Sequence, residues 1–390
     1  MEQGQGAEVR PHVRALVLID AFRMGGAETL LAPMIVASRA TDVDMDVMSV
    51  SPTELNSEKT LKILADAGIA TQSLGIRRLL DPVALPRLAG VIRKGRYDIV
   101  HAHLEMAMTL AVPAAALVRR PAVCTFHHVA VPLTGRAAGR ERLAVEAATR
   151  SYRALFVSEA SRRSFQEIYR PRRMPSNWKV MHNGIDIANF VPGNADPAVR
   201  AELAGGTEGP IVLLPAAFRD FKGIPVAVKA WPLVRQRFPD AVLALVGGGE
   251  SEAELRALVA DRGLAEAVVF VGLRTDMPEV YRAADVVLLP SMLRENLPTV
   301  LIEASATGCA IAASRIGGIP DIVLDNITGL LFEPGSEEGL ADAVCRLLGE
   351  PDLRLRLGAA ARDRAQNEFS AAAWVAQLRA TYLGAIGKRR

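Results

Sequence analysis

Short apolar segments alternate with segments of helical periodicity along almost the whole chain, and this alternation constrains the fold more than any other feature. Ala15–Asp20 (ALVLID) is typical of a buried strand, and Glu28–Ala40 then has apolar residues at helical spacing. Further strand candidates follow at Met45–Ser51, Thr71–Leu74, Asp98–His101, Val123–His127, Leu155–Ser158, Val180–His182, Ile211–Pro215, Ala241–Val246, Val268–Val271, Val286–Leu289 and Ala310–Ser314. Strands that alternate with helices predict an α/β fold with parallel, doubly wound sheets.

The strand candidates form two series, separated by residues 191–210, which are rich in proline, glycine and aspartate. A chain of 390 residues also exceeds one ordinary hydrophobic core. We therefore expect a first domain over residues 1–190, a linker over 191–210, a second domain over 211–370, and a C-terminal helix within 371–390 that can pack back on the first domain. Ligands of open parallel sheets bind at the carboxyl ends of the strands, so functional residues are expected directly after strands.

The composition indicates a globular protein, because half of the residues are hydrophobic, 23% are charged and the mean hydropathy is +0.19. Cys124, Cys309 and Cys345 lie far apart and are too few for a disulfide framework, so we expect reduced thiols in the core. The longest uncharged apolar segment, Met106–Val118, is shorter than the roughly 20 residues that span a membrane. The N-terminal sequence MEQGQGAEVRPHV is polar and does not resemble an export signal. These features predict a cytoplasmic protein.

Charge is distributed unevenly between the two halves. Residues 1–190 contain 25 Lys and Arg against 18 Asp and Glu, whereas residues 191–390 contain 21 against 25. The first half has arginines at positions 77, 78, 93, 96, 119, 120, 136, 140 and 142. Such a half is suited to the anionic inner face of a membrane or to a phosphorylated acceptor, although a solvated basic face gives the same composition. We expect no nucleic-acid partner.

Two glycine-rich turns follow strand candidates. Gly25 and Gly26 come between the first strand and its helix, where backbone amides can approach a phosphate, although a plain turn before a helix has the same sequence. A second run, 247–249, follows Ala241–Val246, but Glu252 stands where a dinucleotide-binding fingerprint needs a third glycine. A nicotinamide-dependent dehydrogenase is therefore disfavoured.

The second half supplies cations and carboxylates after its strands. Arg219 and Lys222 follow Ile211–Pro215, where they can bind a diphosphate, although cations in loops are often only solvated. After Val286–Leu289, the sequence ENLPTVLIE places Pro298 in the first turn of a helix. Backbone amides of Asn296, Leu297, Pro298, Thr299 and Val300 lie around the positive end of that helix, of which the proline alone has no N–H. Glu303 is four residues beyond Thr299, on the same side, and is suited to the two hydroxyls of a ribose.

With these segments the chain resembles the retaining glycosyltransferases of family 4 (glycosyl transferases group 1), which have the GT-B architecture. The segments that carry the resemblance are GGAE at 25–28, YDIVHAH at 97–103, TFHH at 125–128, VSEASRRSF at 157–165, HNGIDIANF at 182–190, FRDFKG at 218–223, LVGGGESEAEL at 245–255, FVGLRTDMPEVYRAADVVLLPS at 270–291, ENLPTVLIEASATG at 295–308, GGIPDIV at 317–323 and TGLLFEPG at 328–335. The resemblance implies two Rossmann-like doubly wound domains that face each other across a cleft.

The resemblance also implies roles for individual residues. Glu295 and Glu303 match the two glutamates of the family's E-x7-E motif, the first near the donor sugar and the second on the nucleotide ribose. Arg219 and Lys222 match the diphosphate clamp, and His127 matches the histidine that touches the donor sugar or the developing charge. The expected catalytic residues are thus His127, Glu295, Lys222 and Arg219.

Two further features refine these expectations. Gly272 and Arg274 follow a strand and are placed to reach the nucleobase. The family has a small residue where this chain has Asn296, and a glycine-rich start of the clamp loop where it has Ala216, Ala217 and Phe218, so the donor sugar cannot be carried over.

Metal binding is not expected. His101 and His103 have the spacing of a ligand pair, but no third ligand with matching spacing follows, so a buried, hydrogen-bonded His101 is the preferred interpretation. The resemblance likewise implies no obligatory metal or other cofactor beyond the nucleotide-sugar donor.

The predicted function is a retaining glycosyltransferase, most simply a hexosyltransferase, that uses a nucleotide sugar, with UDP favoured and GDP possible. The basic half and the absent membrane span favour a lipid-linked or cell-envelope glycan acceptor, as in polysaccharide biosynthesis. The alternatives are a GT-B epimerase or phosphorylase, although the chain offers no obvious site for the pyridoxal lysine of a phosphorylase, and a non-catalytic nucleotide-sugar-binding protein. Product analysis separates the first two, and donor binding without turnover would identify the third.

Overall fold

The computed structural model describes residues 12–170, 172–293 and 295–388, and the chain forms two compact α/β units. The first unit contains the chain up to Val157, then Ser161–Gly184 and the segment from Ala371 onward. The second unit contains Ser158–Ala160 and Ile185–Ser370. The N-terminal segment in which no export signal is expected lies almost entirely outside the described residues.

The first unit is built around a parallel sheet. Its strands are β1 (Val13–Ile19), β2 (Val43–Ser49), β3 (Thr71–Ser73), β4 (Ile99–His103), β5 (Ala122–Phe126), β6 (Arg153–Phe156) and β7 (Trp178–Val180). Its helices are α1 (Gly26–Thr29), α2 (Leu31–Ser38), α3 (Glu58–Asp66), α4 (Ala84–Lys94), α5 (Glu105–Leu117), α6 (Gly135–Arg150), α7 (Glu159–Tyr169) and the C-terminal α16 (Ala371–Gly387), with a short 3-10 turn η1 (Thr53–Leu55). The spatial order of the strands is β3-β2-β1-β4-β5-β6-β7, so the order reverses between β1 and β4.

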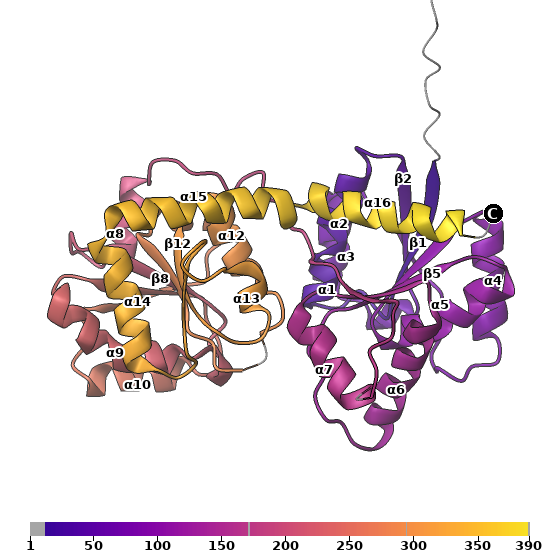
Figure 1. The fold of residues 1–390 in the computed structure, drawn as a ribbon, viewed down its shortest axis with the longest axis horizontal. Coiled ribbons are helices and arrows are strands. Elements are labelled where there is room, and N and C mark those ends of the chain that lie inside the picture. The colour runs from indigo at the N-terminus through magenta and orange to yellow at the C-terminus, as the bar shows by residue number, and fades with distance from the viewer. Residues whose placement is uncertain (1–11, 171, 294, 389–390) are drawn as a thin grey trace, which may run out of the picture. The chain divides into compact units, whose positions relative to one another are not determined.

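Helices cover this sheet in two groups. Helices α4, α5 and α6 pack side by side, and α16 packs along α2, as Figure 1 shows. The core between the sheet and the first group is continuous and includes the stacked rings of Phe126 and Phe156. Helix α16 is anchored by Trp374, Leu378 and Tyr382, all of which are buried. The last helix of the chain is therefore part of the first unit.

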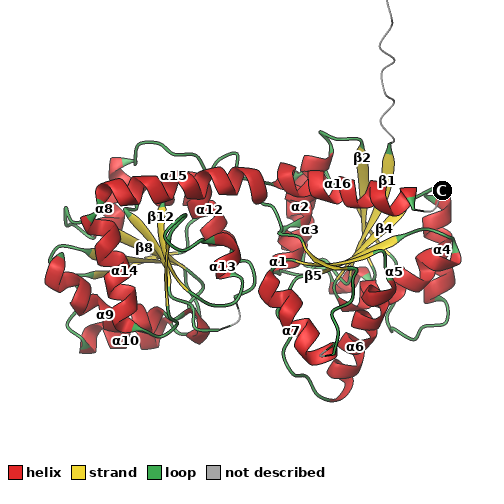
Figure 2. Ribbon diagram, viewed as in Figure 1, coloured by secondary structure: helices red, strands yellow, loops and turns green. Residues whose placement is uncertain are grey.

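The second unit repeats this plan. Its strands are β8 (Ile211–Pro215), β9 (Val242–Val246), β10 (Val268–Gly272), β11 (Val286–Leu289), β12 (Ala310–Ser314) and β13 (Leu330–Phe332). Its helices are α8 (Pro197–Ala204), α9 (Ile224–Arg237), α10 (Glu252–Asp261), α11 (Met277–Ala283), α12 (Thr299–Thr307), α13 (Ile319–Ile322), α14 (Glu337–Gly349) and α15 (Pro351–Glu368), with the 3-10 turn η2 (Asp220–Lys222). The order is β10-β9-β8-β11-β12-β13, and here the reversal falls between β8 and β11. Figure 2 shows strands surrounded by helices in each unit.

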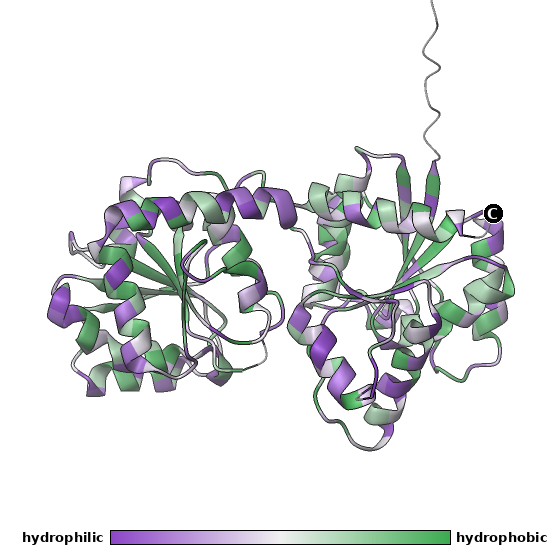
Figure 3. Cartoon of the chain, viewed as in Figure 1, coloured by the Kyte–Doolittle hydropathy of each residue, from purple (hydrophilic) through white to green (hydrophobic). Residues whose placement is uncertain are grey.

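Apolar residues are concentrated on the strands of both sheets, as Figure 3 shows. Strands β8, β9, β11 and β12 are buried at every residue, which explains their continuous apolar sequences. Cys124, Cys309 and Cys345 are free and buried, as expected. No described helix is both long and apolar enough to cross a membrane.

The strands expected from the sequence are confirmed to within a few residues. One strand, β13, was missed, because its sequence LLF carries no alternation that marks a strand. The helix expected over 28–40 is divided at Leu30 into α1 and α2. The C-terminal helix expected within 371–390 is confirmed as α16.

The boundary between the units differs from the expected linker over 191–210. That stretch contains helix α8, which begins with an Asp196 cap and a proline and buries Val199 and Leu203 within the second unit. Arg200 also binds the carbonyl oxygen of Ala283 and the carboxylate of Asp285. The chain instead passes between the units near Gly184 and again near Ser370. The proline and glycine residues on either side of α8 led the sequence to predict a linker where a capped helix lies.

Candidate functional site

A lysine and a glutamate meet in the second unit at the point where the strand order reverses. Lys222 ends η2 after β8, and Glu295 lies in the loop after β11. Lys222 Nζ is 2.6 Å from Glu295 Oε1, and the Ser291 hydroxyl donates a hydrogen bond to the same oxygen over 2.6 Å. Glu295 is 5% exposed, so these two contacts replace water at a buried oxygen that must be hydrogen-bonded. The sequence named both residues but did not predict that they contact each other.

Two glycines allow the loops that carry this pair to approach each other. Gly223 has a φ of +68°, and a Cβ there would lie 1.9 Å from the carbonyl oxygen of Pro290. Gly317 has a φ of +56°, and its Cβ would lie 2.0 Å from the carbonyl oxygen of Glu295. Both positions combine a left-handed backbone with a close contact that any side chain would break. Glycine is therefore required on each side of the Lys222–Glu295 pair.

Glu303 lies on α12 and is held by Tyr281. The tyrosine hydroxyl is 2.9 Å from Glu303 Oε2 and 3.1 Å from the carbonyl oxygen of Val300. Burial raises the pKa of Glu303, and hydrogen bonds from Tyr281 and Thr299 act in the opposite direction. The sequence did not identify Tyr281, which is recognised only once α11 and α12 pack together.

The start of α12 has free hydrogen-bonding capacity. The helix begins at Thr299 and Pro298 is its cap, one residue later than expected, and no side chain caps the end. The side-chain nitrogen Nδ2 of Asn296 is buried and has no hydrogen-bond partner among the described residues. Leu297 and Val300 are partly buried on either side of the cap. An unpaired buried donor next to Glu295 is the feature expected of a site that receives a polar ligand.

Arg219 and Arg274 have neighbours other than Lys222 and Glu295. Arg219 is exposed and lines a separate cavity of about 140 Å³ with Ser251 and Glu254. Arg274 forms ion pairs with Asp276, over 2.6 Å, and with Glu202 of α8. These partners hold the pKa of Arg274 above its ordinary value. Gly272 ends β10 with a φ of +83°, and its carbonyl oxygen accepts a hydrogen bond from Gly247 N.

The glycine turn of the first unit faces a carboxylate. Gly25 caps the four-residue helix α1, and a Cβ on Gly25 would lie 2.5 Å from Glu28 Oε2. Gly26 follows with open space around it. Burial raises the pKa of Glu28. The turn expected to bind phosphate thus has an acidic side chain beside Gly25.

Four buried residues lie close together behind His127, namely His103, His101, Thr125 and Tyr382, and the ring centroids of His101 and His103 are 4.2 Å apart. His127 Nε2 is 2.7 Å from His103 Nδ1, and His127 Nδ1 is 3.4 Å from Asn183 Nδ2. His101 bonds Tyr382 over 2.6 Å and Thr125 over 2.7 Å, as the sequence analysis expected for a buried histidine. Burial lowers the pKa of His101 to about 3 and lowers that of His127 well below its usual value. His127 is therefore neutral, and both of its ring nitrogens lie near protein groups.

A cavity of about 510 Å³ lies within the first unit, at the carboxyl ends of its central strands. Its walls are formed by residues that follow the strands β1 to β5. These residues are Asp20, Ala21 and Arg23 after β1, Ser51 after β2, Arg77, Arg78 and Leu79 after β3, Leu104, Glu105 and Met106 after β4, and His128 after β5. Glu28, Thr109 and Arg140 complete the lining. Asp20 accepts hydrogen bonds from the backbone nitrogens of Met106 and Ala107, while burial raises its pKa to about 6.

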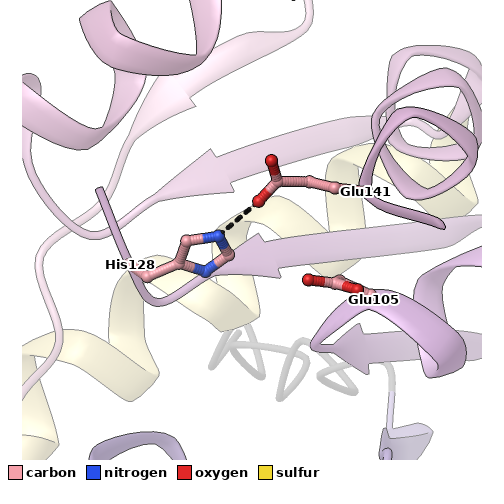
Figure 4. A group of neighbouring side chains, drawn as sticks. All are labelled: Glu105, His128 and Glu141. Carbon is pink, nitrogen blue, oxygen red and sulfur yellow. Dashed lines mark hydrogen bonds and ion pairs between the residues drawn. The ribbon is translucent and has the colours of Figure 1, made fainter. Parts of the chain in front are cut away.

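One wall of this cavity carries a cluster of a histidine and two glutamates. His128 Nε2 is 2.7 Å from Glu141 Oε1, the other Glu141 oxygen accepts the hydroxyl of Tyr169, and Glu105 points toward the same imidazole (Figure 4). One ligand-type atom from each of Glu105, His128 and Glu141 lies within 4.8 Å of the others. The sequence missed this cluster because Glu105 and Glu141 begin or lie within helices, at no fixed spacing from His128.

Comparison with known proteins adds to this geometry. Residues 24–189 match the family model described as Glycosyltransferase Family 4, and residues 196–364 match the model described as Glycosyl transferases group 1. A GDP-mannose-dependent alpha-(1-6)-phosphatidylinositol monomannoside mannosyltransferase of Mycobacterium tuberculosis is 36% identical over 219 residues, which are 53% of this chain and 55% of that protein. The chain thus spans about half the length of this relative.

Proteins that match a larger share of this chain support the same family. A D-inositol 3-phosphate glycosyltransferase of Pseudarthrobacter chlorophenolicus is 32% identical over 292 residues, covering 70% of this chain and 67% of that protein. The structure of HepE from Anabaena in complex with UDP has a TM-score of 0.80 at 23% identity, over 95% of this chain and 100% of that one. A glycosyltransferase from Rickettsia africae also gives 0.80, at 20% identity, over 96% and 99%. The structural likeness confirms the expected GT-B type of α/β fold. With both family models matched in succession, the chain belongs to the group 1 glycosyl transferases of family 4.

Proposed function

We propose that this protein is a glycosyltransferase that transfers a hexose, with retention of configuration, from a nucleotide sugar to a hydroxyl group. The observation that carries the proposal is the meeting of Lys222 and Glu295 at the β8–β11 reversal, because ligands of open α/β sheets bind at such a point. The unpaired Nδ2 of Asn296 and the uncapped start of α12 lie in the same loop and helix. Retention rests on the family resemblance alone.

In this mechanism the leaving diphosphate carries the charge that develops during transfer. Lys222 and the amides at the start of α12 would stabilise it, so no divalent cation is required. A contribution from Arg219, which lines a separate cavity, rests on the family resemblance alone. Glu295 would bind sugar hydroxyls and Glu303 the ribose, since a carboxylate accepts hydrogen bonds from two neighbouring hydroxyl groups. The role of His127 at the donor sugar rests on the family resemblance alone, and because its ring is neutral it would contribute no positive charge there.

The donor nucleotide is either UDP or GDP. The sequence favours UDP, and HepE binds UDP, whereas the 36% identical relative is named for GDP-mannose. A thermal-shift panel of UDP, GDP, ADP and TDP, with and without magnesium, tests the proposal, because a ligand of the native state raises its stability. One selective nucleotide, active without magnesium and lost in Glu303→Ala, is the expected result. Lys229→Ala, on the neighbouring α9, is the matched control.

Product analysis then tests transfer and stereochemistry. NMR of the glycosidic product should show the anomeric configuration of the donor. An inverted product contradicts retention, and an epimerised nucleotide sugar supports the epimerase. Binding without any product supports the non-catalytic alternative. Continued activity in EDTA is expected if transfer needs no metal.

The acceptor is proposed to be a lipid-linked or cell-envelope glycan, reached by peripheral contact with an anionic membrane on the cytoplasmic side. All nine arginines named above are exposed in the first unit. Such a surface binds anionic lipid more strongly at low salt. Co-sedimentation with phosphatidylglycerol vesicles, but not with phosphatidylcholine vesicles, is expected at low ionic strength. Equal partition onto both contradicts the membrane contact.

A further inference from the structure

Two histidines of β4 bond to residues that lie further along the neighbouring strand β5. His103 pairs with Thr125 in the register of these parallel strands, yet its imidazole bonds His127, two residues further on. His101 has the same offset, because it bonds Thr125 and not the residue beside it in the register. Alternate residues of a strand face the same side of a sheet. The H-x-H spacing of β4 thus supports a row of hydrogen-bonded side chains, in which His103 is the residue that contacts His127.

His103 has little freedom to turn away from His127. It is 1% exposed, and its ring centroid lies 4.2 Å from that of His101, which is itself bonded to Thr125 and Tyr382. The rings of His103 and His127 are tilted by only 26° and their centroids are 5.0 Å apart. With 2.7 Å between His103 Nδ1 and His127 Nε2, these two nitrogens lie on the line that joins the rings. The geometry is that of an N–H···N hydrogen bond.

This hydrogen bond links the proton positions of the two rings. Burial lowers the pKa of His103 and the pKa of His127 well below their usual values, so both imidazoles are neutral. A neutral imidazole has one N–H and one bare nitrogen. At their contact one ring therefore donates and the other accepts, and the tautomer of His103 determines the tautomer of His127.

The other nitrogen of His103 indicates which ring donates. Its Nε2 is buried and has no hydrogen-bond partner among the described residues. Buried N–H groups without an acceptor are rarer in proteins than buried acceptors without a donor. The proton of His103 therefore lies on Nδ1, from which it is donated to Nε2 of His127. His127 then carries its own proton on Nδ1, on the side of Asn183.

Asn183 is compatible with this tautomer of His127. Its Nδ2 is 3.4 Å from His127 Nδ1, which is long for a hydrogen bond. Its Oδ1 is buried and has no partner among the described residues. A half-turn of the amide exchanges nitrogen and oxygen, and would give the Nδ1–H of His127 an acceptor. Asn183 thus accommodates either tautomer, and the shorter contact to His103 decides between them.

We propose that His103 is a positioning residue for glycosyl transfer, which donates a hydrogen bond to Nε2 of His127 and leaves the Nδ1–H of that ring for a ligand. The inference rests on the proposed function, because the role of His127 at the donor sugar comes from the family resemblance. A ring with one fixed N–H is a preorganised hydrogen-bond donor, whereas a ring that changes tautomer presents this N–H only part of the time.

NMR of the full chain with 15N-labelled histidine tests the tautomer, because protonated and bare ring nitrogens differ in chemical shift. Loss of signals in His127→Gln assigns them. In the wild-type protein His127 should carry its proton on Nδ1. His103→Leu should give the other tautomer or a mixture, whereas His103→Asn, whose amide N–H can replace Nδ1–H, should keep it. A wild-type His127 with its proton on Nε2, or unchanged shifts in His103→Leu, overturns the inference.

Steady-state kinetics then test whether this tautomer serves transfer. His103→Leu should lower kcat about tenfold, as expected for one lost hydrogen bond, and leave the Kd of the nucleoside diphosphate unchanged. His103→Asn should recover most of kcat. Tyr382→Phe is the control, because it removes a hydrogen bond to the neighbouring His101 and should keep the wild-type kcat. Equal kcat losses in His103→Leu and Tyr382→Phe, or no loss in His103→Leu, overturn the inference.

The two readouts keep this inference separate from the proposed function. A protein that binds no nucleotide and transfers no sugar contradicts the proposed function, and the NMR spectra still show whether His103 fixes the tautomer of His127. A protein that transfers sugar at the same rate with and without the His103 hydrogen bond rejects only this inference.

Discussion

Glu295 accepts hydrogen bonds on a single oxygen, Oε1, from Lys222 and from Ser291, each over 2.6 Å. The ion pair joins the loop after β8 to the loop after β11, and Ser291 is held in turn by a hydrogen bond from Ser314 to its carbonyl oxygen. A positive and a negative group are thereby fixed beside the start of α12. This arrangement gives the first prediction.

Lys222→Ala should lower the rate of transfer about 100- to 1,000-fold, because removing one preorganised partner of a developing negative charge typically costs about 3 to 4 kcal/mol. Steady-state kinetics with the selected nucleotide sugar would measure this loss. Lys229→Ala should keep the wild-type rate. An unchanged rate in Lys222→Ala contradicts the assignment of Lys222 to the diphosphate.

The Lys222→Ala variant should also lose folding stability, so its loss of rate must be distinguished from unfolding. Lys222→Ala leaves the Glu295 charge without its cation, which should lower the free energy of unfolding by about 3 kcal/mol. The double variant Lys222→Ala with Glu295→Gln removes the unpaired charge and should recover stability without recovering activity. Urea denaturation of both variants distinguishes the two effects.

Asn296→Ala should weaken binding of the donor sugar but not of the free nucleotide. Nδ2 of Asn296 is a buried donor without a partner among the described residues, so it is available to a sugar hydroxyl. Loss of one such hydrogen bond should raise the KM for the nucleotide sugar about tenfold and leave the Kd of the nucleoside diphosphate unchanged. Parallel weakening of both would assign Asn296 to loop structure instead.

The affinity for nucleotide should depend on the charge of Glu303. Burial raises the pKa of this carboxyl, and the hydrogen bond from Tyr281 opposes that shift by stabilising the charged form. Affinity should therefore fall as pH decreases through the pKa of Glu303, because the protonated group accepts the ribose hydroxyls less well. Tyr281→Phe should move this fall to higher pH. Titrations of the selective nucleotide between pH 5 and 8 would show it, and the same profile in Glu303→Gln would contradict it.

Tyr382→Phe should destabilise the first unit. The Tyr382 hydroxyl on α16 is 2.6 Å from His101 Nδ1, and both groups are buried. Removing the hydroxyl leaves a buried ring nitrogen without this partner, which should cost about 1 to 3 kcal/mol. Chemical denaturation would measure the change, and Thr381→Ala, at a half-buried position of the same helix, should change stability far less.

The sequence predicted those parts of the site that depend on position after a strand. Lys222, Glu295 and Glu303 follow buried strands with strong apolar signals, so their common edge was predictable. Tyr281 and Glu141 were not, because each reaches its partner from a helix whose packing no local pattern encodes. The linker was misplaced for the same reason, since only tertiary contacts show that Val199 and Leu203 are buried.

Arg274 follows β10 where the sequence places it, but its contacts are not those expected of a residue that reaches the nucleobase. Its guanidinium group pairs with Glu202 and Asp276. Glu202 belongs to the stretch that was interpreted as a linker. A sequence interpretation that treats α8 as unstructured therefore misses the partner that determines where Arg274 points.

Burial raises the pKa of Asp20 from 3.8 to about 6, so the stability of the protein should depend on pH through this group. Because the folded protein holds this proton more tightly, the unfolded chain releases it first as pH rises above about 4. Rising pH therefore favours unfolding across this window, and the contribution of Asp20 to stability is lost once pH passes about 6. A shift of about two units corresponds to about 3 kcal/mol.

Asp20→Asn removes that dependence, because an amide does not titrate. The variant also replaces one acceptor of the Met106 and Ala107 nitrogens by a donor, which should cost about 1 to 3 kcal/mol at every pH. The wild-type protein should thus be clearly more stable at pH 4.5, and the difference should shrink or reverse by pH 7. Urea denaturation of both proteins at the two pH values measures this difference. A constant difference would mean that Asp20 ionises in the folded protein as it does in the unfolded chain, and that the floor of the cavity is open to water.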